Sequence, residues 1–253
     1  DILFDESQVE QGRNFCNKIW NAYRLIRGWE VSADIAQNEH SKLAAEWFDN
    51  KLSQTIETID DLFSKFRLSD ALMTLYKFFW DDFCAWYLEV IKPEYGKPID
   101  KVTYDMTIVF FEKLLRLLHP IMPFITEELW QNIEERKVGE TIMLQSQPKA
   151  APYNKETIHE FEQGVGAIAS IRNIRQSKGI SPKEPLTLQI KGDFPQKIAS
   201  VVKRMANISE VSIVESIDNS VNGAAFMVDT IEFFVPLTGM VNAEEEIAKM
   251  EAE

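Results

Sequence analysis

Apolar residues recur at helical spacing through almost all of residues 7–136, and this pattern constrains the fold more than any other feature of the chain. In the first helix the apolar side chains fall on one face, at intervals of three or four residues. They are Phe15, Ile19, Tyr23 and Ile26. After a polar break at residues 30–39, the second helix places on one side Leu43, Trp47, Leu52, Ile56, Ile59, Leu62, Phe63 and Phe66.

Three further helices follow before residue 137. Ser69-Asp70 opens one that ends before Lys92-Pro93, the next spans residues 100–119, and a shorter one spans residues 126–136 beyond the prolines at 120 and 123. Apolar helices joined by short breaks predict a helical bundle over residues 1–136.

The pattern changes after residue 136. Residues 137–154 are irregular and predict a linker. Residues 155–240 predict a small α+β domain with three to four strands, built from a helix at 155–178 that ends at Gly179, a strand at 186–191, a helix at 195–206, and strands at 211–214, 224–228 and 231–235. A charged helix begins at residue 243, and we expect residues 241–253 to be the start of a truncated C-terminal helical arm. The fold class is therefore mainly α.

Composition indicates the cellular compartment of the protein. Of the 253 residues, 45% are hydrophobic, which is ample for a packed core. No run approaches the roughly 18 apolar residues of a membrane span, and residues 1–10 are acidic rather than a signal sequence. Cys16 and Cys84 lack the spacing of a metal or redox pair and are expected to be free thiols. These features predict a cytoplasmic protein without a membrane partner.

The polar face of the first helix carries the strongest functional signal. The net charge of −13 argues against a generic nucleic-acid binder, yet residues 11–29 contain four cations and no acid. Phosphates respond only to charges within about 8 Å at physiological salt, so such a local patch can still bind RNA. Asparagine is a poor helix former, but its amide can hydrogen-bond base edges. A solvated helix face explains the same residues equally well.

Other motifs predict little chemistry. Adjacent acidic pairs such as Asp60-Asp61 point to different helix faces, and the three histidines lack partners at metal-ligand spacing. We expect no catalytic and no metal-binding residues. Gly164-Val165-Gly166 lies inside a helical pattern and favours close helix packing over phosphate binding.

A second acid-free stretch spans residues 163–183. Its cations Arg172, Arg175 and Lys178 form a ridge that is a possible secondary RNA contact, although a solvated helix face accounts for it more simply.

Several segments resemble the valyl-tRNA synthetase family, in the same order along the chain. Residues 13–22 (RNFCNKIWNA) resemble the opening of that family's anticodon-binding bundle, and residues 79–89 and 114–130 resemble its third and fourth bundle helices. Residues 171–175 with 180–182 resemble the start of its α+β domain. The 119–130 segment is shared by several class I synthetases, whereas the NKxWNA segment favours the valine enzyme. The resemblance covers essentially the whole chain.

The resemblance implies tRNA anticodon recognition, valine-specific, by a non-catalytic and monomeric fragment. The family's catalytic domain, which uses ATP, and its editing domain are the other parts of the polypeptide and are not in this sequence, so no cofactor is expected here. The implied anticodon-binding residues are Arg13, Asn14, Asn17, Lys18, Asn21, Arg24, Leu25, Arg27 and Leu88. Asparagine amides would read base edges, Lys18 and Arg24 would contact phosphates or bases, and Leu25 and Leu88 would form an apolar platform.

One position departs from the family. The family usually has Phe where this chain has Leu25. Because leucine has no π-face, Tyr23 or Tyr87 is the alternative residue on which a base could stack. Two other functions stay open. One is a helical scaffold that binds a protein partner, and the other is the equivalent domain of an isoleucine-type class I synthetase.

Overall fold

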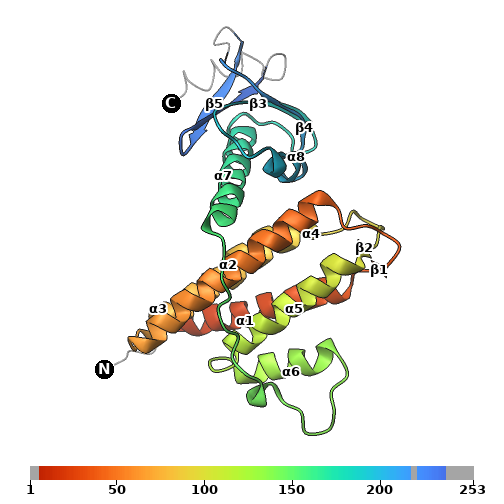
Figure 1. Cartoon of the computed structure of the whole chain (residues 1–253), viewed down its shortest axis with the longest axis vertical. Coiled ribbons are helices and arrows are strands. Elements are labelled where there is room, and N and C mark those ends of the chain that lie inside the picture. Colours follow the sequence, from red (N-terminus) through yellow and green to blue (C-terminus); the bar gives the residue numbers. More distant parts are fainter. Residues whose placement is uncertain (1–5, 218–220, 238–253) are drawn as a thin grey trace. The chain divides into compact units, whose positions relative to one another are not determined.

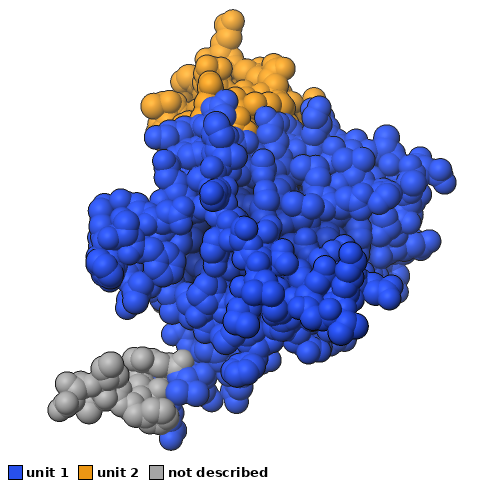
Figure 2. All heavy atoms as spheres, turned by 60° about the horizontal axis from the view of Figure 1, so that its bottom comes forward, with its two compact units in different colours: residues 1–155 blue, residues 156–253 orange. Residues whose placement is uncertain are grey.

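A computed structural model of the chain describes residues 6–217 and 221–237 and divides into two compact units, residues 1–155 and 156–253 (Figures 1 and 2). The stretch 137–154, separated above as a linker, belongs with the first unit; there the Tyr153 hydroxyl donates to Glu57 Oε2 at 2.6 Å. The arm expected at 241–253 lies outside the described residues.

The first unit is the helical bundle that the apolar periodicity predicts (Figure 1). Its elements are α1 (Glu6–Arg27), β1 (Val31–Ser32), α2 (Glu39–Ser64), α3 (Leu68–Lys77), the π-helix η1 (Phe78–Tyr87), α4 (Leu88–Ile91), β2 (Ile99–Asp100), α5 (Lys101–Leu118), α6 (Pro123–Ile133) and the 3₁₀ turn η2 (Ile142–Leu144). Strands β1 and β2 pair in parallel, Val31 opposite Ile99. None of the helices in the described residues is long and apolar enough to cross a membrane.

Side chains at the helix starts explain where two of these helices begin. The Asn38 side chain accepts a hydrogen bond from the Ser41 amide at 2.8 Å, and the Asp100 side chain accepts one from the Thr103 amide at 2.8 Å. Both satisfy an amide that the helix leaves without a partner. Pro123, expected to stop a helix, instead stands in the first turn of α6, where its missing N–H costs nothing.

The helix expected from Ser69 to Val90 is not uniform, because residues 78–87 form a π-helix between α3 and α4. The Leu88 amide donates to the Phe83 carbonyl, five residues back, as π-geometry requires. In such a turn residues five apart share a face, so Phe78 and Phe83 both pack on Phe48, with ring centroids 5.1 and 5.4 Å away. The aromatic core of the bundle is thus built on η1.

Two residues of the predicted core, Phe63 and Phe66, are exposed, at 41% and 89%. Phe66 was placed on the apolar side of the second helix, but α2 ends at Ser64 and Phe66 is 89% exposed with a φ of +57°. The prediction is wrong for Phe66 because the chain reverses here toward α3, which takes this residue out of the helical register.

The described residues of the second unit have the expected small α+β fold, with four strands. It comprises α7 (Lys155–Ser177), β3 (Leu186–Lys191), the 3₁₀ turn η3 (Gln196–Ile198), α8 (Ala199–Ala206), β4 (Ile208–Ile213), β5 (Gly223–Val228) and β6 (Ile231–Pro236). The strand order is β4-β3-β6-β5, with β3 parallel to β4 and antiparallel to β6. The alternating burial of β3 places Leu186, Leu188 and Ile190 in the core.

Glycines set two contacts of α7. A Cβ at Gly164 would collide with the Ile198 side chain, and one at Gly166 would lie 2.9 Å from Val228 Cγ1, so both glycines permit the close packing expected from the sequence. Gly179 ends α7 with a φ of +67°, and the Ile180 amide donates to the Arg175 carbonyl at 2.8 Å, which closes a Schellman-type cap.

Candidate nucleic-acid interface

The polar face of α1 consists of two adjacent stripes, each with alternating spacings of four and three residues. The first, here the Arg–Trp stripe, contains Arg13, Asn17, Trp20, Arg24 and Arg27, all exposed. The second, the Asn–Leu stripe, contains exposed Asn14 and Asn21 and half-buried Lys18 and Leu25. A 3.6-residue repeat makes side chains at these spacings neighbours along one side of a helix.

The opposite face of α1 fixes these stripes in place. Phe15, Ile19, Ala22 and Ile26 are at most 5% exposed and form the core side of the helix. Because four buried residues on successive turns orient the helix, the rotation of α1 is determined by packing, and both stripes stay toward solvent.

The Asn–Leu stripe adjoins the π-helix. Lys18 Nζ lies 4.9 Å from the centroid of the Trp80 ring, a cation–π contact, and Trp80 in turn stacks on Tyr76 at 5.5 Å. Burial raises the pKa of the nearby Cys84 thiol to about 12, and the charge of Lys18 opposes that rise. Cys84 is therefore a neutral thiol at physiological pH, and the charge of this flank comes from Lys18.

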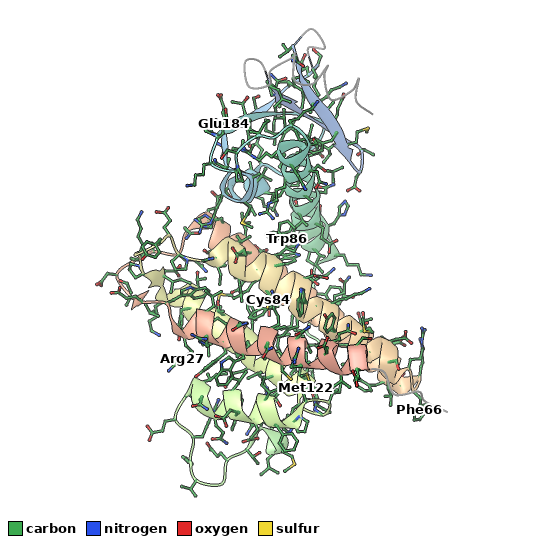
Figure 3. The ribbon with its side chains drawn as sticks, turned by 180° about the vertical axis from the view of Figure 1, so that it is seen from behind. Arg27, Phe66, Cys84, Trp86, Met122 and Glu184 are labelled. Carbon is green, nitrogen blue, oxygen red and sulfur yellow. The ribbon has the colours of Figure 1, made fainter. Side chains whose placement is uncertain are left out.

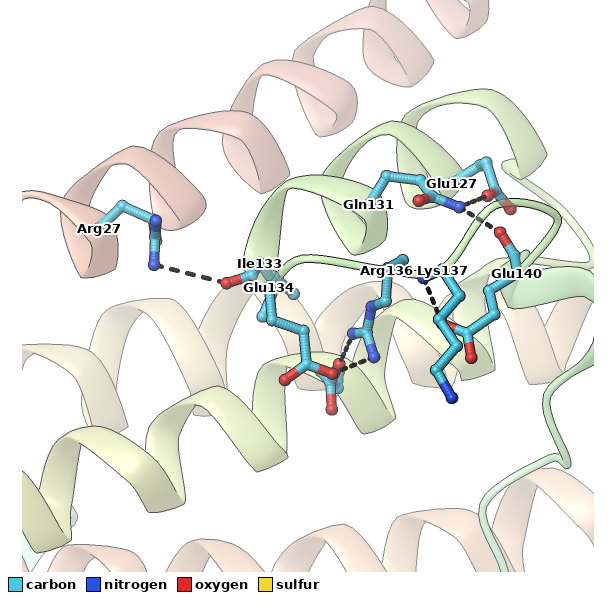
Figure 4. A network of polar contacts seen from close by, with 9 residues as sticks. Arg27, Glu127, Gln131, Ile133, Glu134, Arg136, Lys137 and Glu140 are labelled. Atoms are coloured by element: carbon cyan, nitrogen blue, oxygen red, sulfur yellow. Dashed lines mark hydrogen bonds and ion pairs between the residues drawn. The ribbon is translucent and has the colours of Figure 1, made fainter.

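The Arg–Trp stripe lies on the side of α6. Tyr23 Oη donates to the Asn132 carbonyl at 3.1 Å. Arg27, labelled on α1 in Figure 3, donates from Nη1 to the Ile133 carbonyl at 3.5 Å (Figure 4). The turn after α6 is itself held by Arg136, whose guanidinium pairs with Glu112 and Glu134 and lies 3.7 Å from the Trp130 ring centroid. Arg27 thus contacts the end of α6, beside the turn that Arg136 holds.

A carboxylate anchors the segment beyond α6. Burial would raise the pKa of Glu127, but hydrogen bonds from Thr141, Gln131 and the Ile142 amide together outweigh it and lower that pKa. The ionised carboxylate therefore holds η2 against α6.

The platform prediction fails for Leu88. Its side chain is 1% exposed, because η1 directs it into the core, so it cannot contact RNA without unfolding. Tyr87, an alternative stacking residue, is fully buried, and its hydroxyl hydrogen-bonds Thr107 at 2.8 Å. Tyr23, the other alternative, is half-buried and packs on Phe111, 6.4 Å between centroids.

The prediction of a second cationic ridge at Arg172, Arg175 and Lys178 is wrong for Arg175. Arg175 is 5% exposed and donates hydrogen bonds to the carbonyls of Ser181, Glu184, Ala206 and Asn207, so it is a structural residue of the second unit. Burial lowers its pKa, and the nearby Glu184 opposes this. Exposed Arg172 and half-buried Lys178 remain as surface cations, and Arg172 Nη2 donates to the Met205 carbonyl at 3.1 Å.

Among the described residues no group of three or more His, Cys, Asp or Glu side chains could hold a metal ion. The arrangement on α1 offers instead amide donors and acceptors, cations and exposed indole, which suit a nucleic-acid ligand.

Comparison with known proteins defines the class. A family described as the anticodon-binding domain of tRNA ligase matches residues 45–190, more than half of the 253 residues, and the chain belongs to this family. Helix α1 precedes the matched range.

Similarity to named proteins is more specific than the family match. The chain is similar along its whole length to the valine--tRNA ligases of Phocaeicola vulgatus (52% identical), Bacteroides thetaiotaomicron (49%) and Geobacillus stearothermophilus (34%). It spans 29% of the length of the first two relatives and 30% of the third.

Sequence reasoning missed Trp20 and Trp80 as members of this surface. Trp20 completes the spacing of the Arg–Trp stripe between Asn17 and Arg24, so the four-and-three pattern alone could have identified it. Trp80 has no such signal, because only the packing of η1 beside α1 brings it to Lys18.

Proposed function

We propose that this chain recognises the anticodon loop of a tRNA. The supporting observation is the exposed polar face of α1 within residues 11–29, which carry four cations and no acid, in a chain of the anticodon-binding family. Residues 1–136 would form the anticodon-binding bundle, residues 137–154 would connect it, and residues 155–240 would form the small α+β domain. The bases of a single-stranded loop are splayed, so side-chain amides can reach their edges while cations hold the phosphates.

Both stripes would take part, with roles that follow the type of side chain. Asn14, Asn17 and Asn21 are proposed to hydrogen-bond base edges, and Leu25 is proposed as apolar cover. The cations Lys18 and Arg24 would hold phosphates or bases, and Arg13 and Arg27 would add flanking charge. Arg172 and Lys178 remain a proposed secondary contact.

The whole protein is proposed to be a valine--tRNA ligase. Its substrates would be valine, ATP and the valine tRNA, and its catalytic and editing domains would be this chain's partners in one polypeptide. We propose that it acts in the cytoplasm as a monomer. This chain alone is expected not to support valine-dependent pyrophosphate exchange, because that reaction needs a phosphate-binding site for ATP.

A titration of the chain with labelled valine tRNA at several salt concentrations tests the proposal. Four cations on phosphates predict a decline of log K with log salt at a slope on the order of 3. The same tRNA with a changed anticodon, and an isoleucine tRNA, serve as competitors. Tighter binding of the isoleucine tRNA would favour an isoleucine-type domain. No binding at low salt, or binding without salt dependence, would favour a protein-binding scaffold.

A further inference from the structure

Trp20 is an exposed aromatic residue in the middle of the Arg–Trp stripe. Its side chain is 41% exposed, whereas Trp47 and Trp130 of the same unit are 1% and 3% exposed. The stripe places Asn17 one turn before it and Arg24 one turn after it. The indole therefore leaves apolar surface in water on the same stripe as three arginines.

The indole of Trp20 lies beside Tyr23, whose position is fixed by two other contacts. Its ring centroid lies 6.0 Å from that of Tyr23, whose hydroxyl donates to the Asn132 carbonyl at 3.1 Å. Tyr23 also packs on the buried ring of Phe111, 6.4 Å away. Because Tyr23 is held at both its hydroxyl and its ring, the position of Trp20 beside it is restricted before any ligand binds.

The charges around Trp20 select the class of ligand. Arg13, Arg24 and Arg27 share its stripe. Glu10 pairs with Arg13 at 3.4 Å. Residues 11–29 contain no acid, however, so positive charge prevails on the side of Trp20 toward Arg24 and Arg27. An anionic ligand with a flat aromatic group satisfies both features, since its phosphates meet the arginines and its base meets the indole. A single-stranded RNA segment has this composition. A double-stranded one does not expose its base faces.

We propose that Trp20 is the stacking residue of this interface, the one on which an unpaired base of the anticodon loop rests. This inference rests on the proposed tRNA binding and adds to it a residue outside the set implied by the family resemblance. It also supplies the π-face that Leu25 lacks and that the buried Tyr87 cannot offer.

The test compares Trp20→Ala, Trp20→Leu and Trp20→Phe in the full chain. Stacking on an aromatic side chain corresponds to a loss of about five- to 150-fold in affinity on truncation. We expect Trp20→Ala and Trp20→Leu to weaken binding of the valine tRNA by tenfold or more and Trp20→Phe to restore most of it. The salt slope should not change, because no phosphate contact is lost.

Three further measurements separate stacking from a folding effect and from general apolar contact. Phe124 is 90% exposed in the same unit, but the next turn of its helix carries Glu127 and Glu128, so Phe124→Ala should leave tRNA affinity unchanged. Thermal melts of all variants should agree within a few degrees. Anticodon hairpins with one loop base removed at a time should include one position at which Trp20→Ala no longer weakens binding.

The outcomes are distinct. If wild-type chain binds no tRNA, the proposed function itself fails. If it binds tRNA with the expected salt slope but Trp20→Leu binds as tightly as wild type, or Trp20→Phe is as weak as Trp20→Ala, Trp20 does not stack. If the loss persists with every base-removed hairpin, the indole contacts something other than a loop base, and the inference is overturned.

Discussion

Replacement of Arg175 by Met is expected to destabilise the second unit strongly. The guanidinium is 5% exposed, and its Nη1 donates to the carbonyls of Ser181 at 2.9 Å and Glu184 at 2.8 Å. Its Nη2 donates to the carbonyls of Ala206 at 3.0 Å and Asn207 at 3.1 Å. One side chain therefore ties the end of α7 to the turn before β3 and to the end of α8.

The magnitude follows from these four bonds. Hydrogen bonds that involve a charged group contribute about 1.5–3 kcal/mol each. They do not add fully, because the adjoining cavity of about 570 Å³ lets water reach some of the carbonyls after the change. A loss of about 3–5 kcal/mol is expected, as for other broken buried charge networks. For a unit of this size that corresponds to a fall of more than about 12 °C in Tm.

The assay is urea and thermal unfolding of the whole chain, with amide hydrogen exchange to assign the loss to the second unit. Arg172→Met is the matched control, because Arg172 is an exposed arginine one turn away on the same helix. It should cost less than about 1 kcal/mol. If Arg175→Met unfolds within about 1 kcal/mol of wild type, the four carbonyls do not depend on this guanidinium and the reasoning is refuted.

Three further outcomes are expected. Asn17→Ala and Asn21→Ala should each narrow the affinity gap between the valine tRNA and its anticodon variants by about 1–3 kcal/mol, measured by competition binding; an equal effect on all tRNAs would contradict base reading. The pKa of Glu127 is lower in the folded state, so its ionised carboxylate stabilises the fold above the unfolded pKa of about 4.3, and this contribution is lost as the pH falls through the folded pKa. The urea midpoint should therefore drop more steeply below about pH 5 in wild type than in Glu127→Gln. Parallel curves of midpoint against pH would exclude a stabilising role for this carboxylate. Gly164→Ala should lower the unfolding free energy by about 1 kcal/mol, because overpacking against η3 exceeds the gain in helix propensity. Gly12→Ala, whose added Cβ would meet no atom within 4 Å, should raise the unfolding free energy by about 0.5–1 kcal/mol. A Gly164→Ala variant more stable than wild type would show that α7 has room for a methyl group there.

Local pattern determined much of this protein from sequence. The apolar repeat of α1 predicts its buried face of Phe15, Ile19 and Ile26, and the alternation of β3 predicts its buried side. Gly179 marks the end of α7 because its left-handed φ is easy only for glycine. These features depend on a residue and its near neighbours, so the bundle followed by a small α+β fold is readable from the chain.

Tertiary packing decided which side chains the surface offers. Leu88 and Arg175 carry the right chemistry for an RNA contact. Leu88 is placed in the core by the π-register of η1, and Arg175 is enclosed by carbonyls from two segments, residues 181–184 and 206–207. Trp80 reaches Lys18 only because η1 packs beside α1. Periodicity tells which residues share a face of a helix. Whether that face is covered depends on segments distant in sequence, and only their packing in three dimensions settles it.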